Sequence, residues 1–340
     1  EHTVTKPCYQ PPEDEHPFAR YVRILGKGKR GSRSLNQAEA RAAFGMLLQG
    51  KAEPLQQGAF LMLLRVKEET AEELAGFVQA CRQSMHAPGA IHADLDWSSY
   101  AGKRHQHPWF ILSMLLLAGA GYRVFVHGSD GHTPGRLYTE DAMRQLGLPV
   151  AVDWQEVGTQ LDEHQLSYLP LRHFCYPLHE MMQLRPLLGL RSPVNTLARM
   201  INPLGAPASI QSVFHPAYAA LHQQTDNILG QPRALVFKGD SGEVEVKPHA
   251  DTQLFLLSDG DTQEWSLPRS VRQRVSNVDF PRVGPLRELW LGNNDDTYGL
   301  DATIATTAAA LLVLEPTLQP ATAQSRAEEL WHNRDRGRLS

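Results

Sequence analysis

The sequence predicts an α/β protein with a small all-helical domain, and three features indicate this fold class. Apolar residues recur with helical spacing between residues 36 and 87. After Pro88, helical patterns alternate with short apolar strand patterns, which is typical of α/β domains. The chain has 340 residues, of which 42% are hydrophobic, so it is long and apolar enough to bury a large core.

The N-terminal part is predicted to be a helical bundle. The segment SLNQAEARAAFGMLLQG begins with a polar cap and ends at Gly50. Farther along, the segment ETAEELAGFVQACRQSM repeats apolar residues along one helical face, starting from Ala71. We therefore expect a small helical domain over residues 15–88, completed by a second helical block at about 178–208.

The larger α/β domain is expected over residues 89–177 and about 209–340. Its predicted helices cover residues 109–118, 139–146, 156–161 and 300–314. Its predicted strands cover residues 123–127, 233–237, 243–247 and 251–257, with a short strand near residue 150 and a strand and helix within 209–229. A polar, arginine-rich tail closes the chain.

Composition excludes several classes of protein. The longest apolar run, Phe110 to Ala118, is far shorter than the roughly 20 residues of a membrane span, so we expect no membrane association and a cytoplasmic protein. The three cysteines, Cys8, Cys81 and Cys175, show no paired spacing, which favours reduced thiols over disulfides. The stretch 173–179 contains residue types that bind zinc, but no second cluster would complete four ligands.

Charge is distributed unevenly along the chain. The formal net charge of −4 argues against a polyanionic partner, but three segments are rich in lysine and arginine and nearly free of acids. These segments are residues 16–38, 97–129 and 165–225, and the last of them contains a single acid, Glu180. If the three segments converge in space, they form a basic surface.

We expect the cations of these segments, together with one histidine, to contact nucleic acid or phosphate. The candidates are Lys27, Lys29, Arg30, Arg33, Lys103, Arg104, His127, Arg172, Arg185 and Arg199. Lysine and arginine neutralise backbone phosphates without reading sequence, and aromatic side chains stack on unpaired bases.

Simpler roles remain open for the same residues. The run GKGKRGSR can be a solvated loop, the Lys103-Arg104 pair can form an internal ion pair, and the later arginines can brace helix ends. His127 can be a structural residue after a strand, and Arg191 is expected to pack within its own motif.

Four stretches of sequence carry a resemblance to a known family. They are HisGly at 127–128, RPLLGLRSPVNTLARMINPLG at 185–205, LVFKGDSGEVEV, and the late helix TIATTAAALLVL. Taken in order, they resemble the anthranilate phosphoribosyltransferase family. The resemblance covers nearly the whole chain and implies the fold shared with nucleoside phosphorylases, in which a small helical domain accompanies a larger α/β domain.

The chain departs from the family pattern at the positions that the family uses for its substrates. Where the family has GTGGD to bind pyrophosphate, this chain has Ser98 to Arg104, so we expect no tight backbone cradle. Where the family has an AspGlu pair for magnesium, this chain has Val244 and Glu245. Valine offers no oxygen ligand, which leaves Glu245 as a weak metal candidate.

These departures resemble a side branch of the family, the YbiB-type proteins, described as nucleic-acid-binding homodimers without anthranilate phosphoribosyltransferase activity. The resemblance implies a homodimer that binds single-stranded DNA or RNA in basic clefts, without cofactor and without strong sequence preference. It also implies a two-fold interface on the apolar faces of the N-terminal helices and the second helical block. A phosphoribosyltransferase with an unidentified acceptor and a scaffold for protein partners stay open as alternatives.

Overall fold

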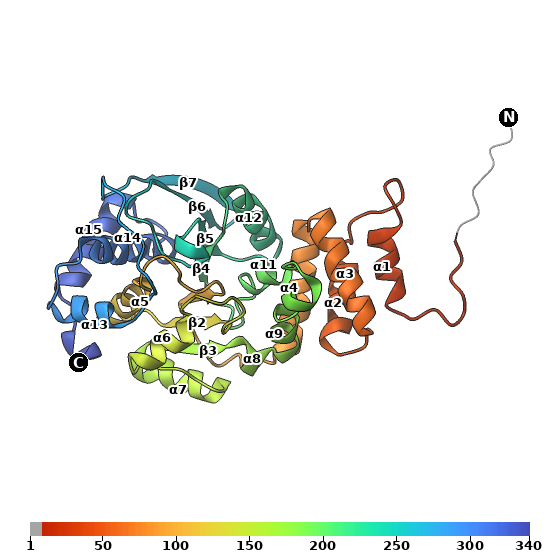
Figure 1. Ribbon diagram of the computed structural model, residues 1–340, viewed down its shortest axis with the longest axis horizontal. Helices are drawn as coiled ribbons and strands as arrows, with labels where there is room; N and C mark the ends of the chain where they lie inside the picture. The colour runs from red at the N-terminus through yellow and green to blue at the C-terminus, as the bar shows by residue number, and fades with distance from the viewer. Residues whose placement is uncertain (1–8) are drawn as a thin grey trace.

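The computed structural model describes residues 9–340 and divides them into a helical bundle and a larger α/β domain (Figure 1). This arrangement confirms the predicted fold class. Cys8 lies outside the described residues, and Cys81 and Cys175 are buried free thiols.

The helical bundle begins with four helices whose starts are encoded locally. They are α1 (Ala19–Gly26), α2 (Gln37–Leu48), α3 (Pro54–Lys67) and α4 (Ala71–Met85). Asn36 and Thr70 cap α2 and α4, and in both cases a glutamate three residues later returns a hydrogen bond to the cap.

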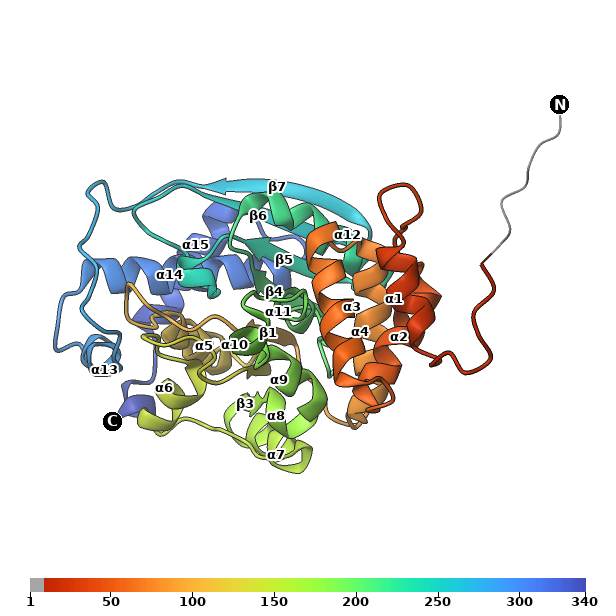
Figure 2. The same cartoon turned by 45° about the vertical axis from the view of Figure 1, so that its right-hand side comes forward.

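The second helical block consists of short helices rather than one long element. They are α8 (Leu171–Phe174), α9 (Tyr176–Met182), α10 (Arg185–Leu188) and α11 (Val194–Ala198). This block lies beside the N-terminal helices (Figure 2). Phe60 and Phe77 belong to the same buried cluster as Leu178 and Leu197, so the bundle is built from two distant parts of the chain.

The α/β domain contains a seven-stranded sheet. Its strands are β1 (Leu95–Ser99), β2 (Val124–Gly128), β3 (Leu166–Pro170), β4 (Ala208–Ser212), β5 (Arg233–Phe237), β6 (Thr252–Ser258) and β7 (Asp261–Leu267). The strand order is β3-β2-β1-β4-β5-β6-β7, with β1 to β5 parallel and the last two strands antiparallel. All residues of the five parallel strands are buried, as expected for a sheet covered on both faces.

Helices cover the sheet and connect its strands. They are α5 (Phe110–Gly119), α6 (Thr139–Gln145), α7 (Trp154–His164), α12 (Ala219–Ile228), α13 (Gly284–Leu291), α14 (Thr297–Leu314) and α15 (Pro320–His332). Within residues 9–340, α14 is the one helix long and apolar enough to cross a bilayer, but 72% of it is buried inside the fold, where it packs against α5 and α15.

The strand order reverses between β1 and β4, and ligands of open α/β sheets bind beyond the carboxyl ends of the strands at such a reversal. Close packing at this edge explains Gly128 at the end of β2. A Cβ atom there would lie 2.0 Å from the backbone oxygen of Ser99. The glycine of the HisGly motif is therefore required for packing between β1 and β2.

Several elements differ from the sequence prediction. The predicted strand at 243–247 is wrong, because these residues follow a short 3₁₀ turn, η2 (Asp240–Gly242), and form no ladder. Strands β1, β3 and β7 and helices α13 and α15 were not predicted. Residues 98–99 belong to β1 rather than to a loop, since polar Ser98 and Ser99 obscured the strand pattern.

Candidate functional site

The loop that follows β1 has two convergent backbone donors, and the protein's own carboxylate occupies them. The N–H groups of Ala101 and Gly102 donate hydrogen bonds of 2.9 and 2.8 Å to Oε1 of Glu243. Ser99 Oγ donates a bond of 2.8 Å to Oε2 of the same side chain. The expectation that no backbone cradle exists here is therefore wrong in part, because the donors converge but hold an internal anion.

Lys103, the next residue of this loop, is fully buried and faces two carboxylates. Its ammonium forms ion pairs with Asp240 and Glu245. Burial opposes the charged lysine, but the two carboxylates outweigh burial and raise its pKa. Burial also raises the pKa of Glu245 to about 7. Lys103 is thus committed to an internal ion pair and is not exposed to a phosphate backbone, contrary to its predicted role.

These residues do not fit the magnesium ion that the family resemblance implies. The Lys103 ammonium contacts both Asp240 and Glu245, and Val244, which stands where the family has the aspartate of its AspGlu pair, has no ligand atom. Within residues 9–340, no group of three or more histidine, cysteine, aspartate or glutamate side chains could hold a metal.

The His127 side chain is also buried and bonded to other buried side chains. Its ring nitrogens lie 2.6 Å from the Tyr100 hydroxyl and 3.0 Å from a carboxylate oxygen of Asp96. The side chain is completely buried, so a ligand cannot reach it in this structure. The position of His127 therefore agrees with the alternative of a structural residue after a strand and not with the predicted phosphate contact.

Two further candidate cations are neutralised by carboxylates. Arg172 forms paired hydrogen bonds of 2.6 and 3.0 Å with Glu140. Arg33 forms a similar pair with Glu39 and, through those hydrogen bonds, lowers the pKa of Glu39 to about 2. Both arginines therefore brace the fold, which weakens their assignment to a polyanion surface.

The other cations of the N-terminal basic loop, Lys27, Lys29 and Arg30, are exposed in the connection between α1 and α2. That connection approaches the end of α3, because Lys67 Nζ donates a hydrogen bond of 3.0 Å to Ser34 Oγ. The basic loop therefore lies near the C-terminal end of α3, and residues at that end of α3 also line a cleft.

A cleft of about 800 Å³ separates the bundle from the α/β domain, and we call it the arginine cleft. Its lining combines cations, two acids and apolar groups: Arg65, Glu68, Glu69, Arg191, Ser192, Pro193, Asn195, Thr196, Arg199, Val213, Phe214, Ala217, Tyr218, Leu221 and His222. It lies beyond the carboxyl end of β4, at the reversal of strand order.

Five arginines line this cleft or lie near its residue Arg191, and among residues 9–340 none of them forms a salt bridge with a carboxylate. They are Arg65, Arg136, Arg185, Arg191 and Arg199. Burial lowers the pKa of Arg191, and Arg185, Arg136 and Arg65 lower it further. Mutual repulsion of this kind is relieved by a bound anion.

Arg199 forms the floor of the cleft. Its side chain is 5% exposed, and burial lowers its pKa to about 10. The guanidinium donates a hydrogen bond to the carbonyl of Ser212 and lies 4.9 Å from the centre of the Phe214 ring. The Glu243 carboxylate opposes this effect of burial, although within residues 9–340 Arg199 forms no salt bridge, so an anion bound in the cleft would stabilise the charged guanidinium further.

Aromatic side chains line the same cleft. Phe214 and Tyr218 are 41% and 53% exposed. Phe214 packs against Gly242, where an added Cβ atom would lie 2.5 Å from the ring, so glycine is required there. Trp97, Tyr100 and Trp109, by contrast, are buried and unavailable for base stacking.

Sequence reasoning found part of the arginine cleft and missed the rest. It proposed Arg185 and Arg199, expected Arg191 to pack within its motif, and did not consider Arg65 or Arg136 at all. Arg65 stands in a helix beside acids, and Arg136 lies outside the flagged segments, so neither had a local signal.

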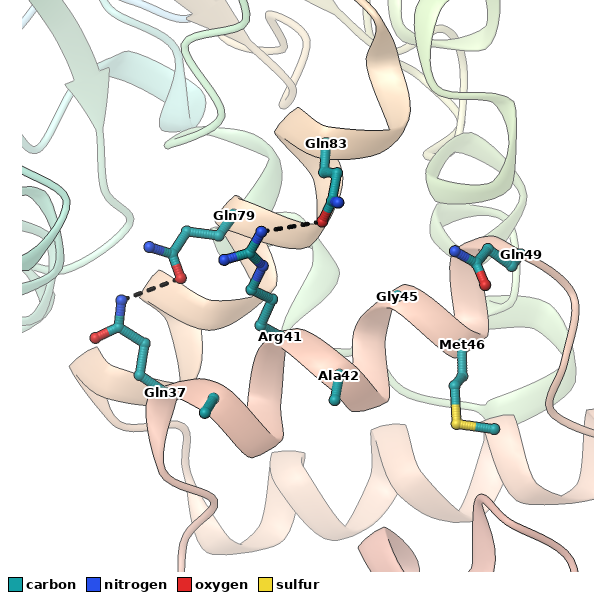
Figure 3. A pocket seen from close by; sticks show the side chains of 9 residues that line it. Gln37, Arg41, Ala42, Gly45, Met46, Gln49, Gln79 and Gln83 are labelled. Atoms are coloured by element: carbon teal, nitrogen blue, oxygen red, sulfur yellow. Dashed lines mark hydrogen bonds between the residues drawn. The ribbon is translucent and has the colours of Figure 1, made fainter.

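Another hollow, of about 610 Å³, lies on the outer face of α2 and α4 (Figure 3). Its polar side chains pair with one another. Gln37 and Gln79 share a hydrogen bond of 3.0 Å, and Arg41 donates one of 3.1 Å to Gln83. It has no cluster of unpaired cations, and we do not assign it a ligand.

Two family profiles match the chain in succession. The profile described as "Glycosyl transferase family, helical bundle domain" matches residues 21–85, and "Glycosyl transferase family, a/b domain" matches residues 111–333. The boundary between them falls where the bundle gives way to the sheet.

Individual proteins match over most of the chain. The uncharacterized protein YbiB of Escherichia coli (strain K12) is 30% identical over 245 residues, which covers 71% of this chain and 76% of that protein. An anthranilate phosphoribosyltransferase of Methylorubrum extorquens is 29% identical over 270 residues, 78% of each chain.

Solved structures share the fold. Anthranilate phosphoribosyltransferase from Thermus thermophilus has a TM-score of 0.78 at 21% identity, covering 94% of this chain and 96% of that one. The enzyme from Saccharomyces cerevisiae, in complex with PRPP and Mg, has a TM-score of 0.75 at 17% identity, covering 95% of each chain.

Proposed function

This chain belongs to the glycosyl transferase family whose members combine a helical bundle domain with an α/β domain, and from that premise we propose that it binds nucleic acid. It is a homodimer that holds single-stranded DNA or RNA in the arginine cleft, without strong sequence preference and without anthranilate phosphoribosyltransferase activity. The observation that carries this proposal is the group of arginines without carboxylate partners within residues 9–340.

The chemistry of the cleft matches a single strand better than a small anion. Arg191 and Arg199 supply positive charge at two depths, and Phe214 and Tyr218 supply exposed rings beside them. The phosphates of a single strand can contact the two arginines, and its unpaired bases can stack on the two aromatic rings. Phosphate contacts carry no base information, so little sequence preference follows.

An apolar surface on the bundle supports the homodimer. Leu55 and Val66 of α3 are 88% and 82% exposed, and Leu187 of α10 is 84% exposed. The two helices are adjacent, since a Cβ atom added at Gly58 would lie 3.7 Å from a methyl carbon of Leu188. Exposed leucine and valine side chains at helical spacing favour burial against a second copy of the same surface.

Phosphoribosyl transfer to an unidentified acceptor is the second candidate. The retained Asp240 and Glu245 carboxylates and the paired N–H groups of the loop after β1 favour it. These groups are bound to Lys103 and Glu243, however, so a substrate would have to displace an internal ammonium and an internal carboxylate.

One binding experiment separates the two candidates. Fluorescence anisotropy of a labelled oligothymidylate is measured with the purified protein at low and moderate salt, alone and with phosphoribosyl pyrophosphate and magnesium. The nucleic-acid proposal expects salt-sensitive binding that the small ligand does not displace. Absence of binding at low salt would overturn it, and complete displacement by the small ligand would favour the transferase.

A further inference from the structure

A second group of cations lies on the other side of the η2 turn from the arginine cleft, and we call it the distal patch. It consists of Arg104, Lys238, Lys247 and Arg274, of which only Arg104 was a candidate from sequence. Arg104, Lys238 and Arg274 are exposed, and Lys247 is half-buried. Lys238 directly follows β5, at the carboxyl edge of the parallel strands where the cleft also lies.

The long connection between β7 and α13 brings distant cations together here. This connection runs beside α14 (Figure 2) and is anchored on the loop after β1. Val278 N donates a hydrogen bond of 3.0 Å to the carbonyl of His105, and Gln106 Nε2 donates one of 3.1 Å to the carbonyl of Ser276. The anchor places Arg274 close to residues that precede it by more than a hundred positions.

The distal patch is positively charged without matching acids. Burial lowers the pKa of Lys247; Asp240 opposes this, while Lys238, Lys103 and Arg274 lower it further. Within residues 9–340, Lys238, Lys247 and Arg274 form no salt bridge. Asp279 is the one acid in the connection 268–283, against four arginines. Repulsion among these cations favours a polyanionic partner over a neutral one.

The η2 turn joins the distal patch to the cleft. Arg136, whose charge lowers the pKa of Arg191 and Arg199 in the cleft, donates a hydrogen bond of 3.0 Å from Nη1 to the carbonyl of Ser241. The backbone N–H of Arg104, which belongs to the distal patch, donates one of 3.2 Å to the hydroxyl of the same serine. Phe214 of the cleft packs against Gly242 of the same turn. Cations therefore continue from one surface to the other with a single turn between them.

We propose that one single strand of nucleic acid runs from the arginine cleft across the Ser241 turn and onto the distal patch, where Lys238, Lys247 and Arg274 contact its phosphates. This inference rests on the proposed function and adds the path of the strand. A strand too short to cross the turn contacts only the cleft, whereas a longer strand gains the distal contacts. Affinity therefore increases with strand length until the distal patch is filled.

The test uses the double variant Lys238→Gln with Arg274→Gln, because both side chains are exposed and their loss leaves the core intact. The matched control is Arg41→Gln with Lys51→Gln, two exposed cations of the helical bundle that change the net charge equally. Anisotropy titrations use oligothymidylates of increasing length over a series of salt concentrations.

The expected result is a length-dependent loss. For long strands, the slope of log affinity against log salt falls by about 1.4 in the double variant, or about 0.7 for each lost phosphate contact. Short strands bind the double variant and the wild type equally, and the control variant matches the wild type at every length.

Two outcomes overturn the proposal while the proposed function stands. Long strands that bind the double variant with unchanged affinity and slope exclude the distal patch, and an equal loss for short and long strands excludes a separate distal contact. Wild-type protein that binds no strand of any length overturns the proposed function itself. An acidic peptide that binds the wild type but not the double variant, while long strands bind both equally, would assign the patch to a protein partner instead.

Discussion

The carboxylate of Glu243 accepts a hydrogen bond of 2.8 Å from the backbone N–H of Gly102, at the loop where the family resemblance implies a pyrophosphate. Ala101 donates a second bond of 2.9 Å to the same oxygen. Paired backbone donors of this kind form anion-binding concavities. The protein thus fills an anion position with its own side chain.

Replacing Glu243 with alanine should destabilise the protein and create an anion site. The substitution leaves two buried N–H groups without acceptors, at a cost of about 1–3 kcal/mol in the free energy of unfolding for each unsatisfied group. Pyrophosphate should then raise the melting temperature of Glu243→Ala more than that of wild type. Glu243→Gln, which keeps one acceptor oxygen, should lie between them.

The control for this variant is Glu163→Ala, at an exposed position. It should leave both the melting temperature and its response to pyrophosphate unchanged. If Glu243→Ala melts like wild type and ignores pyrophosphate, the carboxylate is not holding the loop donors in the way the hydrogen bonds indicate.

We predict no anthranilate phosphoribosyltransferase turnover by the purified protein in a sensitive fluorescence assay with magnesium. The reason is that Lys103 contacts both retained carboxylates and Glu243 fills the anion position. The single change Val244→Asp should not restore activity, because it adds a carboxylate without removing the lysine. Turnover above background in wild type would contradict this prediction.

Replacing Lys103 with methionine should be strongly destabilising at neutral pH. It leaves Asp240 and Glu245 buried without their partner, and breaking a buried ion pair in this way costs about 3–5 kcal/mol. The cost is expected to be this large because the Lys103 side chain is fully buried.

The loss should depend on pH in a defined direction. Burial raises the pKa of Glu245 to about 7, so its contribution favours the folded state at low pH and is lost as pH rises through about 7. Lys103 lowers the pKa of Glu245, so its removal raises that pKa above the wild-type value, and the deficit of Lys103→Met should shrink as pH falls from alkaline values toward 7, where the unpaired carboxyl is protonated. Chemical denaturation across this range measures it, and Lys103→Met with Glu245→Gln should reduce the deficit at pH above 7. A deficit independent of pH would argue against the ion pair as its cause.

Sequence patterns predicted the fold class well because helical periodicity and the strand–helix alternation are local signals. Parallel strand β5 was found at its observed bounds, since RALVF is a continuous apolar run after its first residue. Strand β1 was missed because LDWSS carries polar residues, whose hydrogen bonds to Thr139 and Glu243 exist only in the folded protein. Local patterns do not show such distant partners.

The candidate site was harder to predict for the same reason. Lys103 and Arg104 are neighbours in sequence, yet one is buried between carboxylates more than 130 positions away and the other is exposed. Arg65 and Arg191 come from the two distant parts of the chain that build the bundle and meet only in the folded protein, where Arg65 Nη1 donates a hydrogen bond of 2.8 Å to the Arg191 carbonyl. Charge runs indicate that cations are present, but not which of them lack partners.

The apolar surface of α3 and α10 should hold the dimer together. Introducing charge with Leu55→Glu and Leu187→Glu should shift the protein to monomers in sedimentation velocity, because both side chains are largely exposed and would be buried by a partner. Val152→Glu serves as control, since Val152 is a 48% exposed apolar residue of the α/β domain. Wild-type protein that sediments as a monomer at micromolar concentration would contradict the homodimer.

The decisive prediction concerns the cations of the arginine cleft. The double variant Arg65→Gln with Arg191→Gln should weaken oligonucleotide binding and lower the slope of log affinity against log salt by about 1.4. Neither residue forms a salt bridge within residues 9–340, so the fold should be retained, as circular dichroism can verify. Because phosphate contacts carry no base information, the loss should be nearly equal for oligonucleotides of different sequence.

A control variant and a comparison of strand lengths make this experiment specific for the cleft. The charge-matched variant Arg41→Gln with Lys51→Gln should bind as wild type does, which separates a local contact from a change in net charge. Short strands, which do not reach the distal patch, should lose most of their affinity when the cleft arginines are replaced, whereas long strands should lose only part. If the cleft variant binds strands of every length with unchanged affinity and salt slope, the binding surface must be sought elsewhere, first at the exposed loop cations Lys27, Lys29 and Arg30.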